Sequence, residues 1–192
     1  MKKILFLIAL AAIVTSNLNA QTVWGVRLGL SWTTISGEED DDSVDGGASI
    51  EAGPVLYHPL PNNFYINAGA MFGLKNIKEG EIKCNMIWLE VPVYAGYAIQ
   101  TQGNVKPFVQ AGPFLGLKFT ENWKYESTSI DDMEWFGNFN AGLGILGGIN
   151  INRFKVELGY KLGLWNIADN DELFYDYKLT MSSLFLGINF IF

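Results

Sequence analysis

Apolar and polar residues alternate in eight separate segments of the chain, and the connections between these segments are long and short in turn. The first twenty residues also have the layout of an export signal. Together these observations predict an all-β fold, an eight-stranded antiparallel up-and-down transmembrane β-barrel preceded by a cleaved signal peptide.

The N-terminus is typical of a secretory signal peptide. Lys2 and Lys3 are followed by eleven apolar residues, 4–14, and by a small and polar run that ends at Ala20. An apolar run of this length is too short for a transmembrane helix. We therefore expect residues 1–20 to be removed and residues 21–192 to form one outer-membrane β-barrel domain.

The first four segments have the period of two that strands produce and helices do not. The fourth is the longest, with apolar residues at every odd position from Ile87 to Ile99. Pro54, in the second segment, lacks the N–H that a strand ladder uses, so we predict a β-bulge there. The predicted strands cover residues 24–30, 50–56, 66–74 and 87–99.

The last four segments repeat the pattern with equal regularity. In the seventh, six apolar residues at even positions from Phe154 to Leu164 alternate with lysine, glutamate and glycine. Pro113, in the fifth, predicts a second bulge for the same reason as Pro54. These strands cover residues 105–117, 139–145, 154–164 and 184–192.

The connections sort by length. Long loops are predicted at residues 34–46, 76–85, 120–134 and 167–179, and short turns at 58–63, 101–104 and 150–153. Seventeen of the twenty acidic residues lie in the four long loops. Bacterial outer-membrane barrels have short periplasmic turns and longer external loops, so this order predicts four acidic loops outside the cell.

Charged residues within the strands share the face opposite the apolar side chains. An eight-stranded barrel has an interior just wide enough for side chains to fill, and unpaired charges there would be costly. We therefore predict a network of ion pairs that plugs the lumen, and we keep a narrow ion or solute path as the alternative. The predicted network is Arg27, Glu51, Glu90, Lys106, Lys155, Glu157 and Lys161.

Aromatic residues lie near strand ends on the apolar face or in the adjoining loops, as in the two interface girdles of a membrane barrel. The predicted interface aromatics are Trp24, Trp32, Phe119, Trp135, Phe190 and Phe192. A soluble periplasmic lipid-binding barrel would turn the apolar face inward. That alternative would have to bury about forty apolar side chains in a small lumen, which disfavours it.

Four short motifs resemble a known family. They are Leu89-Glu90-Val91-Pro92, Gly25-Val26-Arg27-Leu28-Gly29, Pro107-Phe108 with Gly112-Pro113, and the ending Gly187 to Phe192. In this order they resemble the Bacteroidota outer-membrane β-barrel domain, the PorT-like family, whose barrels are OmpA/OmpX-like. The resemblance implies recognition of the terminal Phe192 by the barrel-assembly machinery, and for some relatives a part in protein secretion.

The sequence argues against enzymatic chemistry. His58 is the only histidine and lies in a turn predicted on the periplasmic side, far from any outer-rim nucleophile. No cofactor is expected. Asp40, Asp41 and Asp42 are a weak candidate for a cation site, since carboxylates suit hard cations but the spacing of a calcium loop is missing.

We therefore predict a non-enzymatic barrel with an envelope-structural or loop-mediated binding role. The alternative is a component of a secretion or assembly complex. The expected partners are outer-membrane lipid and lipopolysaccharide, the assembly machinery through Phe192, and an envelope protein. Without Lys2 and Lys3, 11 basic residues face 20 acidic ones, so nucleic acid is excluded as a partner.

Overall fold

The structure is a computed structural model that describes residues 22–37, 44–79, 82–125, 128–130, 137–167 and 179–192. The signal-peptide prediction lies outside the described residues. The regular elements are β1 (Val23–Ser36), β2 (Val44–Pro59), a 3-10 turn η1 (Pro61–Asn63), β3 (Phe64–Gly69), β4 (Met71–Glu79), β5 (Ile82–Ala98), β6 (Val105–Tyr125), β7 (Thr128–Ile130), β8 (Phe139–Ile151), β9 (Phe154–Gly163) and β10 (Thr180–Ile191).

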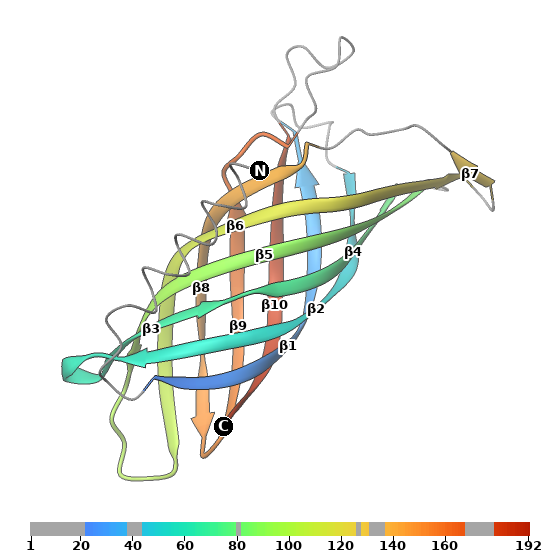
Figure 1. Ribbon diagram of the computed structural model, residues 1–192. Helices are drawn as coiled ribbons and strands as arrows, with labels where there is room; N and C mark the ends of the chain where they lie inside the picture. Colours follow the sequence, from blue (N-terminus) through green and yellow to red (C-terminus); the bar gives the residue numbers. More distant parts are fainter. Residues whose placement is uncertain (1–21, 38–43, 80–81, 126–127, 131–136, 168–178) are drawn as a thin grey trace.

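The strands form a closed antiparallel barrel (Figure 1). Each strand pairs with its neighbour in the chain, β3 and β4 together form the third barrel strand, and β10 returns to pair with β1. Val26 lies opposite Phe190 at this closure. β7 adds only to the far end of β6. The predicted eight-stranded up-and-down barrel is confirmed, and closure leaves no strand edge for lipid to satisfy.

β3 and β4 are separated at Ala70, which lies opposite Pro54. The Ala70 amide donates to the Pro54 carbonyl, with an N···O distance of 3.1 Å, but Pro54 has no N–H to return. The pairs on either side keep one register, so the ladder loses a bond without gaining a residue. These pairs are Ala52↔Phe72 and Val55↔Gly69.

Pro113 is accommodated in the same way. The register of β5 against β6 is the same on both sides of it, from Pro92↔Phe114 to Ala95↔Ala111. Pairing with β8 continues through Pro113↔Leu143. The prediction of bulges at Pro54 and Pro113 is therefore wrong, because losing one donor does not require an extra residue.

The register shifts lie near the outer end of the barrel instead. One separates Thr33 from Ile35 in the β1–β2 pair. The other lies between β5 and β6, where Ile87 pairs with Thr120 but Trp88 pairs with Lys118. Phe119 is therefore the extra residue of a bulge, and it exchanges the two faces of β6 beyond that point.

Polar and apolar side chains separate across the barrel wall. Arg27 and Glu157 are fully buried, whereas outward residues such as Leu28 and Ile145 are 54% and 65% exposed. Most outward positions of the central barrel carry aliphatic or aromatic side chains. The interior is therefore the charged side and the exterior the apolar side, as the charge placement predicts.

The two ends of the barrel differ. Short connections at one end join β2 to β3, β5 to β6 and β8 to β9. At the other end β4 and β5 continue to Glu79 and Ile82, and β6 continues to Tyr125, so this part of the sheet extends beyond its neighbours (Figure 1). The predicted loop at 76–85 is wrong, because Asn76 and Asn85 are a paired position of the β4–β5 ladder. Within the described residues, no helix is long and apolar enough to cross a membrane.

Candidate functional site: the barrel interior

One ion pair lies at the centre of the lumen between β1 and β9. Arg27 Nε is 2.8 Å from Glu157 Oε1, and both side chains are fully buried. Arg27 also donates to the Asn189 and Asn67 side chains, at 3.0 and 2.9 Å. Contacts to three other strands therefore fix the guanidinium plane, as a buried cation in a low-dielectric interior requires.

A second ionic group also lies next to Phe185. Lys161 Nζ is 2.9 Å from Glu51 Oε2 and 2.5 Å from Glu90 Oε1, so one ammonium holds two carboxylates. Lys75 Nζ is 4.0 Å from the second oxygen of Glu90. Arg27 and Lys161 both lie over the Phe185 ring, at 5.9 and 4.6 Å from its centroid.

Lys155 is held mainly by rings and an amide. Its Nζ is 3.9 Å from the Phe108 ring centroid and 2.9 Å from Gln110 Oε1. Glu157 Oε2 lies 3.9 Å away, and Gln110 donates to the same oxygen at 3.1 Å. The amide therefore joins the cation to the carboxylate where the two charges do not meet closely.

Glycines on the inner face make room for the rings. A Cβ at Gly29 would lie 2.3 Å from Phe185 Cε2, and one at Gly96 would lie 2.1 Å from Tyr65 Cζ. Phe185 packs with Tyr94 and Leu146 into a buried apolar layer. The centre of the lumen is thus filled by alternating ionic and aromatic layers.

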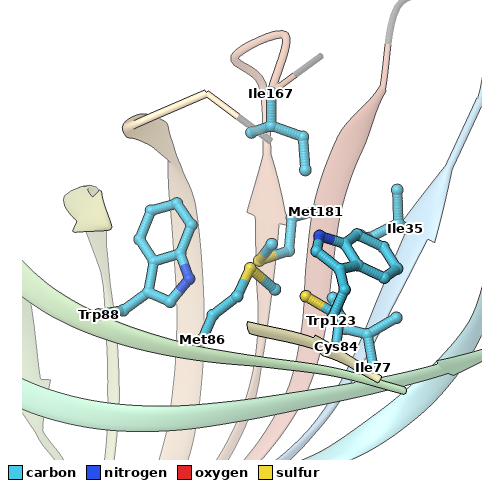
Figure 2. Close-up of a cluster of buried hydrophobic side chains, with 8 residues drawn as sticks. All are labelled: Ile35, Ile77, Cys84, Met86, Trp88, Trp123, Ile167 and Met181. Atoms are coloured by element: carbon cyan, nitrogen blue, oxygen red, sulfur yellow. The ribbon is translucent and has the colours of Figure 1, made fainter. Parts of the chain in front are cut away.

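The outer end of the lumen is apolar. A buried cluster gathers side chains from β1, β4, β5, β6 and β10 and from the connection after β9 (Figure 2). It includes the free thiol of Cys84, which is buried. The members are Ile35, Ile77, Cys84, Met86, Trp88, Trp123, Ile167 and Met181.

The predicted charge network is brought together except at one residue. Arg27, Glu51, Glu90, Lys155, Glu157 and Lys161 all meet in the ion pairs described above. Lys106 is exposed at the start of β6 and forms no ion pair with another described residue, so its prediction is wrong. It has the inward parity of β6 but lies at the short-turn end, where the lumen opens to solvent.

Sequence reasoning missed Lys75 and the apolar outer cluster. Lys75 continues the inward odd positions of its strand, two residues after Gly73, so parity could have found it. Cys84 and Met86 share the inward even parity of Trp88 and Glu90. Lys75 and the cluster residues on β4 and β5 were missed because the outward residues beside them, Asn76 and Asn85, are polar and resemble a loop.

Of the predicted interface aromatics, most lie on the outer surface. Trp24 and Trp32 are exposed near opposite ends of β1, and Phe119 and Phe192 are exposed. Phe190 is partly buried, with its ring 5.3 Å from Phe154 and 5.6 Å from Phe192. Trp135 lies outside the described residues.

The histidine considered for catalysis lies away from the outer end of the barrel. His58 Nδ1 is 3.2 Å from Thr22 Oγ1 near the short-turn end, on β2. No three His, Cys, Asp or Glu side chains come together as metal ligands in the described part of the chain. The acidic run Asp40, Asp41 and Asp42 lies outside it.

A family model for the outer-membrane protein beta-barrel domain matches residues 19–169. The chain belongs to this family. It is therefore a protein of the outer membrane, and the apolar exterior is its lipid-facing surface. The soluble lipid-binding alternative is wrong, because the apolar face points away from the lumen.

Solved structures show the same architecture. Neisserial surface protein A matches with a TM-score of 0.54 and 14% identity, over 88% of this chain and 97% of that one. OprG from Pseudomonas aeruginosa matches with a TM-score of 0.50 and 11% identity, over 88% of this chain and 95% of that one. At these identities the likeness shows the fold alone. No curated protein sequence matches the chain.

Proposed function

We propose that the protein is a closed, non-enzymatic envelope barrel that acts through its external surface and not through its lumen. The observation that carries this proposal is the filled interior. Ionic and aromatic layers occupy the centre, and the apolar cluster occupies the outer end. A solute path would need a gap through every one of these layers.

The part of the barrel beyond the membrane supports an external role. β5 and β6 stay paired as far as Ile82↔Tyr125, β4 pairs with the same end of β5, and β7 adds a fourth strand there. The inner face of this extension is packed by Cys84, Met86 and Trp123. A projection with its own apolar core is a rigid support for contacts at the cell surface.

Membership of the PorT-like branch is part of this proposal. The four motifs in their order support it, since they lie on β1, β5, β6 and β10 of one barrel. A secretion or assembly role would add a protein partner at the periplasmic turns or on the lipid face. Recognition of Phe192 by the assembly machinery is proposed on the same resemblance, and Phe192 is exposed at the chain end.

Conductance across a planar lipid bilayer tests the proposal. The refolded barrel, checked by its boiling-dependent shift on a denaturing gel, should give no resolvable current steps. A general porin inserted under the same conditions provides the positive control. Reproducible steps from the folded protein would overturn the closed lumen and favour the solute path.

A further inference from the structure

Two rows of like residues cross the outward face of the β4–β5–β6 sheet. The first consists of three asparagines, Asn76↔Asn85 and Asn85↔Asn122, all exposed. The second, two residues further out, contains Lys83 and Lys124, which are paired in register. On the other side of Lys83, its backbone partner in β4 is Lys78.

Lys83 and Lys124 are exposed directly opposite each other on this outward face. Cross-strand partners of an antiparallel pair have Cβ atoms about 5 Å apart, and like charges there are destabilising. Neither lysine forms an ion pair with another residue in the described ranges. An anion seated between them would remove the repulsion.

Lys83 and Lys124 lie at the height of the lipid headgroups. Going outward along β5, Ile87 is the last apolar outward residue, followed by Asn85 and Lys83. Four residues correspond to about 13 Å along a strand, and to about 9 Å in height at a tilt near 45°. The polar layer on each side of the hydrocarbon core is about 5–8 Å thick, and a lysine stem can reach back along the protein surface.

The chain is otherwise poor in positive charge, which makes two exposed lysines on directly opposed positions a local exception. Without Lys2 and Lys3 it has 11 basic and 20 acidic residues. A basic site at headgroup height is complementary to the anionic headgroups of the lipid around the barrel. The adjacent amide row offers donors and acceptors at the level between phosphate and acyl chain.

We propose that the lysine row at Lys83 and Lys124, with the asparagine row beneath it, binds the phosphorylated headgroup of an outer-leaflet lipid. Each ammonium donates to phosphate oxygens, and the asparagine amides contact the sugar or acyl linkages below. This site does not depend on the closed lumen. It would give the projecting sheet a fixed attachment to the lipid surface.

The test is a lipid titration of the folded full barrel in zwitterionic detergent, read by native mass spectrometry. The probes are bis-phosphorylated lipid A and the same lipid with both phosphates removed. The variant is Lys83→Gln with Lys124→Gln. The matched control is Lys106→Gln with Arg153→Gln, the same charge change on exposed residues at the opposite end of the barrel.

The Lys83/Lys124 variant should bind phosphorylated lipid A about 10- to 30-fold more weakly, the factor expected for two lysines at an anionic lipid surface. The control variant should bind phosphorylated lipid A as tightly as the wild type. The affinity for the dephosphorylated lipid should be the same with and without Lys83 and Lys124. Equal affinity of variant and wild type would overturn the site. Equally tight binding of inorganic phosphate alone would overturn the lipid as its ligand.

Discussion

The Lys118 ammonium and the Glu121 carboxylate form an ion pair inside the barrel although both lie on β6, three residues apart. On a regular strand, residues three apart point to opposite faces. The bulge at Phe119 removes this conflict by adding one residue, so Lys118 and Glu121 both point inward. It also turns Trp123 inward, where its Nε1 donates to Glu121 at 2.6 Å.

Deleting Phe119 together with Thr120 should therefore misdirect the outer end of β6. Glu121 would then follow Lys118 directly, so Glu121 and Trp123 would face outward, leaving Lys118 without its carboxylate at a cost of about 3 kcal/mol in unfolding free energy. The outer cluster would lose Trp123, so maleimide should label Cys84 faster than in the wild type. Deleting Phe119 alone is the control, because Lys118 and Glu121 are then two residues apart and both still point inward. Unchanged labelling of Cys84 in the double deletion would contradict the assignment of these side chains to the lumen.

Lys161 should be more important for stability than an exposed lysine. Lys161→Met leaves Glu51 and Glu90 buried without their shared cation, and breaking a buried pair costs about 3–5 kcal/mol. Lys106→Met, at the exposed start of β6, should change the unfolding free energy by less than about 0.5 kcal/mol. Urea unfolding of both variants in lipid vesicles, followed by tryptophan fluorescence, measures the difference. Equal stability of Lys161→Met and the wild type would show that the ionic layer is dispensable.

The inner glycines should be sensitive to a single methyl group. Gly96→Ala would place Cβ 2.1 Å from the Tyr65 ring, so Tyr65 and its hydrogen bond to Gln110 must move. Overpacking of this kind costs about 1–3 kcal/mol. At Gly103 a Cβ would meet nothing within 4 Å, so Gly103→Ala serves as the matched control. If both substitutions had the same effect on the urea midpoint, the packing of the lumen would differ from that described.

The membrane part of the fold could be predicted because lipid imposes one rule on every strand. An outward apolar residue at every second position, as in β9, identifies strand, face and register together. The glutamates Glu51, Glu90 and Glu157 could be placed in the lumen for the same reason. Each alternates with lipid-facing residues on both sides.

The part beyond the membrane could not be predicted in this way, because the rule reverses there. On β4 and β5 the inward residues Ile77, Cys84 and Met86 are apolar, whereas the outward Asn76 and Asn85 are polar. If outward apolar residues are required at every second position, this stretch resembles a loop. The bulge at Phe119 adds a change of phase, which period-two counting does not detect.

Spin-label accessibility along β6 in a reconstituted bilayer tests the central claim most directly. Nitroxides at Val109, Gln110 and Lys124 sample the predicted lipid face, the lumen and the surface beyond the membrane. The account predicts strong collision with oxygen and weak collision with a water-soluble nickel chelate at Val109, the reverse at Lys124, and little of either at Gln110. Chelate access at Val109 equal to that at Lys124 would contradict a barrel with its apolar face in lipid.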